Sequence, residues 1–199
     1  MLDKKETQKA LDDFRKYVIQ QSRTNLSKQK KNFNKSLYNS INGVSKVNPN
    51  SISLYFEMLD YGIFVDKGVK GFNPANVSPN AKIRGQQAPN SPYRFGSGNF
   101  KGTWASYTNS LEKWVKRKGV RFRNNGKYAE GSVKAVTRVV ASNIYSRGLK
   151  PSLFFTKPFE KAFKNLPKEL IEAYGIDAVK IYTKKLNEIW QTYLLEALL

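Results

Sequence analysis

The stretch that decides the reading of the fold is YGIFVDKGVKGF, residues 61–72. Its apolar residues surround Gly62 and predict a strand. Gly68 and Gly71 follow and predict a tight turn. The preceding ISLYFEML, residues 52–59, also reads as a strand. We therefore expect the two segments to pair as a hairpin.

A single acid, Asp66, ends this predicted second strand in a basic region. Two interpretations stay open. The carboxylate forms an ion pair, with Lys67, Lys70 or an arginine from the region that follows, or it caps a turn, as Asp readily does. Asp66 would lie near Glu57 and Asp60 across the hairpin, but no metal-loop spacing is present, so we expect neither a metal site nor acid–base catalysis here.

The N-terminal part predicts helices. Apolar residues recur every three or four positions over 3–23, and again over 27–42, as one long helix or two pieces. NGVSKVNPNS, residues 42–51, reads as a turn-rich link. Two further helices are predicted at 104–118 and 131–146, the first ending at Gly119 and the second at Gly148.

The C-terminal part begins with an extended piece framed by prolines. It leads into a helix expected to pack Phe159, Ala162, Phe163 and Leu166. A final helix is predicted over 168–198, with Gly175 as a candidate break. Its expected packed face holds Ile171, Tyr174, Ala178 and Ile181. The closing apolar YLLEALL either docks on the protein's own core or binds a partner.

Residues 72–103 are rich in Pro, Gly, Asn and Ser and show no sustained period. Such a long loop is expected to be ordered mainly by another chain. We predict an α+β fold, with a small twisted, mainly antiparallel sheet against an N-terminal helix and C-terminal helices. Residues 1–71 and 146–199 would form the core, and 72–145 a basic loop-and-helix insertion.

The composition excludes several kinds of catalytic and structural site. The 199 residues include no cysteine and no histidine, which removes disulfides, thiolate chemistry and the usual neutral-pH base. We expect no catalytic residues, no metal and no cofactor. Neither a signal peptide nor an apolar run of membrane-spanning length is visible, so we expect folding in the cytoplasm and no membrane contact.

The charge is uneven. The formal net charge is +20, and residues 61–150 carry 17 basic and 3 acidic side chains, against 7 and 6 in residues 151–199. A charge run is often only a solvated face. A net +14 in 90 residues also fits an anionic neighbour, either phosphate or an acidic protein surface.

Bases and aromatic residues alternate in EKWVKRKGVRFRNNGKY, residues 112–128. Single-strand binders combine these features, but Trp114 lies on the apolar stripe of its helix and is expected in the core. The bases would then touch phosphate without reading sequence. The candidate contacts to DNA or an acidic partner are Lys113, Lys116, Lys118, Arg121, Arg123 and Lys127.

The order of motifs resembles the head–tail joining and tail-completion proteins of tailed phages. Leu37 and Ile41 lie near that family's helix-ending pattern, offset by one residue. YGIFVDKG matches its strand motif, with Asp66 in place of Glu and Gly62 in place of Ala. Pro151, Phe154, Phe155, Pro158 and Ala162 match its third motif. The resemblance covers residues 26–71 and 145–175, and no single motif is specific.

The resemblance implies a structural virion protein rather than an enzyme: a ring-forming neck, connector or tail-terminator subunit, made in the host cytoplasm and placed in the virion. It implies a homo-oligomeric ring, a hexamer in preference to a dodecamer, with portal, neck or tail proteins as partners. The candidate subunit interface is Tyr61, Phe64, Asp66, Lys67 and Lys70. The alternative is a non-catalytic protein that binds nucleic acid without sequence preference.

Overall fold

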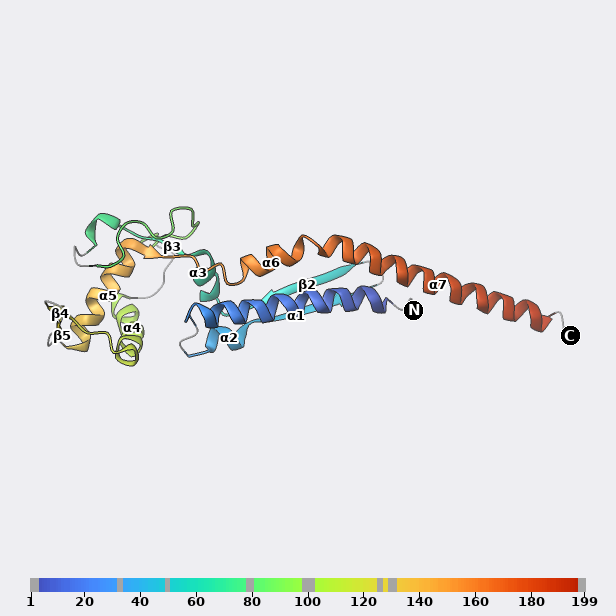
Figure 1. Ribbon diagram of the computed structural model, residues 1–199, viewed down its shortest axis with the longest axis horizontal. Coiled ribbons are helices and arrows are strands. Elements are labelled where there is room, and N and C mark those ends of the chain that lie inside the picture. Colours follow the sequence, from blue (N-terminus) through green and yellow to red (C-terminus); the bar gives the residue numbers. More distant parts are fainter. Residues whose placement is uncertain are drawn as a thin grey trace. The chain divides into compact units, whose positions relative to one another are not determined.

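The computed structural model is α+β, as the sequence predicts, and it describes residues 4–31, 34–48, 51–77, 81–97, 103–124, 127–128 and 132–196. The chain forms two compact units, coloured along the sequence in Figure 1. Unit 1 comprises Met1–Leu59 and Phe154–Leu199, and unit 2 comprises Asp60–Leu153. The boundaries between the two units therefore lie at 59/60 and 153/154.

Unit 1 begins with helix α1, Lys5–Lys28, which is longer than the predicted 3–23. Its buried face follows the apolar period through Leu11, Phe14, Val18 and Leu26. The helix ends where Lys30 takes a left-handed backbone, φ 55°. The predicted helix over 27–42 is wrong in its middle, because the described residues 29–31 and 34–35 are not helical and the helix α2 spans Ser36–Ser40.

The sheet of unit 1 is a hairpin of β1, Asn42–Val47, and β2, Ile52–Glu57, with Val44 opposite Tyr55. The prediction that 52–59 pairs with 61–68 is wrong. The segment 42–51 is not merely a link, since its first half is a strand. The sequence of β1 lacks the usual alternation of apolar residues, because Gly43 and Ser45 occupy the positions that face α1.

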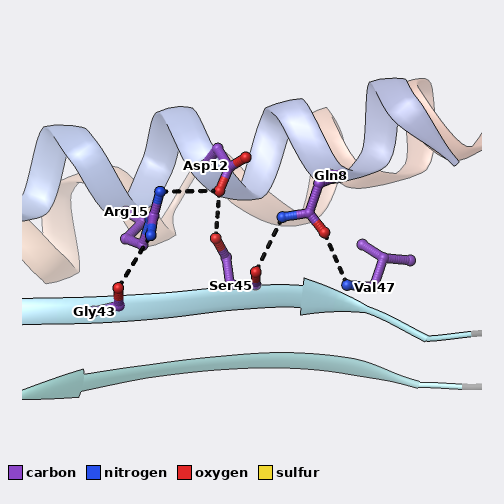
Figure 2. A network of polar contacts seen from close by, with 6 residues as sticks. All are labelled: Gln8, Asp12, Arg15, Gly43, Ser45 and Val47. Atoms are coloured by element: carbon purple, nitrogen blue, oxygen red, sulfur yellow. Dashed lines mark hydrogen bonds and ion pairs between the residues drawn. The ribbon is translucent and has the colours of Figure 1, made fainter.

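Polar side chains of α1 cover the outer edge of β1 (Figure 2). Gln8 accepts from the Val47 amide (2.9 Å) and donates to the Ser45 carbonyl (3.1 Å), and Arg15 donates to the Gly43 carbonyl (3.1 Å). The Ser45 hydroxyl donates to Asp12 at 2.5 Å, which lowers the pKa of that carboxyl. The helix thus satisfies backbone groups that an edge strand leaves open.

The core of unit 1 joins the two ends of its sequence. Leu11, Phe14 and Val18 of α1 pack with Leu166, at the start of the last helix. Phe159 of α6, Thr156–Phe163, meets Phe14 edge-on at 5.7 Å. Phe159, Ala162 and Leu166 pack here as predicted, whereas Phe163 is half exposed.

Helix α7 runs from Leu166 to Glu196 without a break at Gly175. Its predicted packed face is wrong, because Ile171 and Tyr174 are exposed while Ala173 and Asp177 are buried. The side chains of residues 189–196, and all of 197–199, lie outside the described part of the chain, so the two interpretations of the closing apolar run stay open.

Unit 2 begins with a short helix, α3, Tyr61–Lys67, where a strand was predicted. In a helix, Gly62 and Asp66 fall four residues apart on one face, and both are buried. The apolar run around them therefore lies within about two turns of helix rather than in an alternating strand. The helix ends at Gly68, with φ 73°.

The rest of unit 2 follows the predicted helices closely. These are α4, Trp104–Lys118, with Gly119 in the left-handed region (φ 61°), and α5, Val133–Arg147, followed by Gly148 (φ 93°). Short strands β3, Val69–Lys70, and β6, Gly148–Leu149, pair antiparallel, as do β4, Arg123–Asn124, and β5, Lys127–Tyr128. A 3-10 turn, η1, spans Pro74–Asn76.

Candidate functional site

The exposed face of α4 carries the predicted basic contacts. Thr103 caps the helix start by accepting from the Ser106 amide (3.1 Å), and three bases fill its last turn, where positive charge complements the helix dipole. Lys113, Lys116 and Lys118 are exposed along it. Lys116 pairs with Glu112 at 2.8 Å, and this hydrogen bond lowers the pKa of Glu112.

The remaining basic candidates follow α4 in the sequence. Arg121 is exposed just beyond the helix end. Arg123 lies in β4 opposite Tyr128, and Lys127 lies in β5 opposite Asn124. The side chains of Arg123 and Lys127 lie outside the described residues. The structure therefore describes the side chains of four of the six candidates, and all four are exposed.

Aromatic side chains of unit 2 form one cluster around Tyr145. Phe72, Phe95 and Trp104 lie 5.4–5.9 Å from its ring, centroid to centroid. Phe72 and Trp104 are about half exposed. Tyr107 also joins the cluster, and burial raises the pKa of its hydroxyl, which makes no hydrogen bond to a described group.

The predicted interface residues are divided between surface and interior. Tyr61 and Phe64 are 44% and 40% exposed on α3, and Phe64 rests edge-on against Tyr93 at 4.8 Å. Lys67 is exposed and Lys70 half-buried. Asp66 is only 3% exposed. Its carboxylate is therefore covered by its own chain rather than presented on a surface.

Two motifs some 80 residues apart in the sequence meet at the end of α3. The Ser152 and Leu153 amides donate to the Asp66 carbonyl (3.1 and 3.0 Å), and the Ser152 hydroxyl donates to the Val65 carbonyl at 2.6 Å. A Cβ on Gly68 would lie 2.5 Å from the Leu149 carbonyl oxygen. The segment that follows Asp66 is thus packed directly on KPSL, residues 150–153.

The loop that follows is anchored by its own unit over residues 86–95. Gln86 accepts from the Gly71 amide at 2.6 Å, Ser91 donates to the Gly68 carbonyl at 2.7 Å, and the Phe95 amide donates to the Lys70 carbonyl at 2.9 Å. Ser91 is 5% exposed. The expectation that 72–103 is ordered mainly by another chain is wrong for this part, because side-chain bonds to backbone groups replace the apolar contacts that the sequence lacks.

No group of three His, Cys, Asp or Glu side chains within the described residues is placed to hold a metal ion, so Glu57, Asp60 and Asp66 form no such cluster. A shallow depression lies on α7, lined by Val179, Thr183 and Asn187 among others, all from one stretch of one helix. No helix in the described part of the chain is long and apolar enough to cross a bilayer.

Sequence reasoning missed the anchoring role of Asp177. This α7 carboxylate is 1% exposed and accepts from the Thr7 amide (2.9 Å), the Thr7 hydroxyl (2.8 Å) and the Glu6 amide (3.1 Å). Because Lys4 provides no side-chain cap to α1, Asp177 satisfies the free amides of the first turn. No sequence signal marks a cap supplied from 170 residues away.

Comparison of the chain with protein-family models, with curated proteins and with solved structures finds no match.

Proposed function

We propose that this protein is a ring-forming structural subunit of a tailed-phage particle, in the neck, head–tail connector or tail terminator, where it links the portal complex to the tail around the DNA channel. The observation that carries the proposal is the apolar surface that a single copy of unit 1 leaves open. On α7 this surface includes Ile171, Tyr174, Val179 and Tyr182, each 55–73% exposed. Several large apolar side chains exposed on one helix suggest an interaction surface.

The resemblance in motif order adds the phage context. The second motif, YGIFVDKG, lies against residues 149–153, where the third motif begins, at the end of α3. Their joint presence in the sequence therefore has a structural reason, because each supplies the close-packed partner of the other. The basic charge of residues 61–150 suits a position beside DNA, where contacts to phosphate need no base readout.

Assembly of the purified full chain tests the proposal. We expect mass photometry to show a discrete closed oligomer, a hexamer in preference to a dodecamer, and negative-stain images to show rings with a central opening. Closed symmetry is expected because a head-to-tail contact that repeats around an axis saturates at a fixed number of copies. A monomer at all concentrations, alone and with portal or tail components, would contradict the proposal.

A second candidate function, binding of nucleic acid without sequence preference, is favoured by the exposed bases of α4. We expect affinity for duplexes of unrelated sequence to be equal and to fall steeply with salt. Replacing both Lys113 and Lys118 by Gln should weaken binding and reduce the slope of log K against log salt by about 2, since each phosphate contact contributes roughly 0.9.

The matched control replaces two exposed lysines of α6, Lys157 and Lys161, by Gln. It removes the same charge from unit 1, and we expect a much smaller change in slope. Equal effects of the two double variants would show that net charge alone, rather than the α4 surface, attracts the nucleic acid. Salt-independent or sequence-selective binding would exclude this second function.

A further inference from the structure

Helix α7 extends beyond the part of unit 1 against which it packs. Its first half packs on α1, with Leu166, Ala173 and Asp177 buried. Asp177 already binds the first turn of α1, and Lys180, one turn later, pairs with Glu6 at 2.8 Å. From there α7 continues past the beginning of α1, as its red end does in Figure 1.

The continuing half of α7 presents an apolar stripe. Val179, Tyr182 and Leu186 are 66%, 68% and 38% exposed, and they follow one another at three and four residues. Ile189 and Tyr193 continue the same alternation in the sequence. This spacing is that of a coiled-coil seam, in which a stripe packs against a second helix.

An exposed helix of this length needs a packing partner. Short isolated helices are marginal in water, and most helical stability in proteins comes from burial of an amphipathic face. The part of α7 beyond Lys180 has an apolar face, but its described side chains up to Leu186 stay largely in solvent. Burial of this face against another chain would stabilise this half of the helix.

Charge indicates that this chain is a second copy of the same protein. With a net charge of +20, copies repel one another over most of their surface. Residues 151–199 carry only one more base than acid, and on α7 Lys185 is neutralised by Glu188 at 3.0 Å. This near-neutral helix attracts neither phosphate nor an acidic surface, yet it allows self-contact.

We infer that the second half of α7 is the interface between copies, in which the stripe of Val179, Tyr182 and Leu186 packs against α7 of a neighbouring copy. The inference rests on the proposed function, since it names one surface through which subunits meet. A contact between two identical stripes is isologous and joins two copies, so the head-to-tail contact that closes the ring uses a different surface. The described stripe, from Val179 to Leu186, spans only about one heptad, which is short for an independent coiled coil. It therefore contributes to an assembly rather than forming a separate rod.

The absence of cysteine from the sequence makes the test direct. Tyr182→Cys and Leu186→Cys each place one thiol on the stripe, and Lys184→Cys places one on the opposite face of the same helix. We expect a short bismaleimide to give covalent dimers from positions 182 and 186 of the native full chain, and few from 184 or from any variant in denaturant. Absence of cross-links at 182 and 186, or equal cross-linking at 184, overturns the inference.

A charge variant gives a second readout. Leu186→Glu is expected to weaken self-association by about tenfold or more, because each contact must bury two carboxylates. Lys184→Glu changes charge by more but should leave association within about twofold, and circular dichroism should show both variants folded. Association of Leu186→Glu equal to that of Lys184→Glu overturns the inference.

The outcomes separate the inference from the proposed function. If Leu186→Glu still forms the same rings as the wild type, and the cysteine variants at 182 and 186 do not cross-link, the α7 interface is wrong. The proposed ring function is then unaffected. Stripe cross-links in a protein that never forms closed rings support the interface and contradict the ring function. A wild-type protein that neither cross-links nor assembles contradicts both.

Discussion

Replacing Asp177 by Ala is expected to lower the free energy of unfolding of unit 1 by about 2–4 kcal/mol. The substitution removes three hydrogen bonds to a carboxylate and leaves the Thr7 amide buried without a partner. It also removes the cap of α1, which alone typically contributes about 1 kcal/mol. Urea denaturation followed by hydrogen exchange at the first turns of α1 measures the loss.

The same site makes stability depend on pH. Burial raises the pKa of the Asp177 carboxyl, but hydrogen bonds from Thr7 and Glu6 outweigh it, so the pKa lies below the ordinary value of 3.8. Because the folded-state pKa is depressed, the contribution is fully present above the unfolded pKa and is lost as pH falls below about 4 through the folded value. Asp177→Asn should therefore flatten the acid limb of the stability profile of unit 1.

The matched control is Lys180→Ala, one turn further along α7. It removes the pair with Glu6, whose side chains are 60% and 36% exposed, and exposed pairs contribute about 0–1 kcal/mol. A loss in Asp177→Ala no larger than that in Lys180→Ala would show that water satisfies the first turn of α1 equally well.

Gly68→Ala is expected to destabilise unit 2 by about 3 kcal/mol or more. Gly68 has φ +73°, and an added Cβ would lie 2.5 Å from the Leu149 carbonyl oxygen and 2.8 Å from the Pro151 nitrogen. With φ 73° and ψ 179°, Gly68 has a backbone conformation that is essentially restricted to glycine, and another residue there costs about 1–3 kcal/mol. The backbone clash adds to it, because β3 and β6 must separate. Hydrogen exchange at the Lys70 and Phe72 amides, which bond to Tyr93 and Tyr145, reports the change.

Gly85→Ala measures the cost of a positive φ without a steric clash. Gly85 has nearly the same φ, +71°, but nothing lies within 4 Å of the added Cβ. We expect a loss of about 1 kcal/mol, from the left-handed conformation alone. Equal losses in the two variants would mean that the contact between the Gly68 and Pro151 segments yields easily and does not hold the unit together.

Elements whose own residues bury an apolar face could be predicted from the sequence. Helices α1, α4 and α5 follow their apolar periods, and Gly119 and Gly148 end two of them by the predicted backbone geometry. The failures occur where polar atoms replace apolar contacts. Strand β1 pairs Gly43 and Ser45 with polar side chains of α1, so its alternation is invisible to a pattern of apolar residues.

The candidate sites divide in the same physical way. Lys113 and Lys118 are exposed because charged side chains on the polar face of a helix stay in water. The sequence predicts Asp66 at a strand end. In the structure it is buried on a helix whose end bonds to Ser152 and Leu153, and no local sequence pattern indicates this contact. The exposed face of α7 was also misjudged, since Ala173 and Asp177 replace larger apolar residues in the contact with α1.

The cap that Asp177 places on α1 has a consequence for the order of folding during synthesis. At about 5–20 residues per second, a ribosome adds the 170 residues between Thr7 and Asp177 in on the order of ten seconds or more. The continuous unit 2 can be completed within that interval. Helix α1 meets β1 first, through the nearby contacts of Gln8 and Arg15. The hairpin covers part of the apolar face of α1 through Leu54 and Phe56, but the rest of that face is covered only after α6 and α7 have been synthesised. A stalled or truncated product therefore exposes this remaining apolar surface to chaperones.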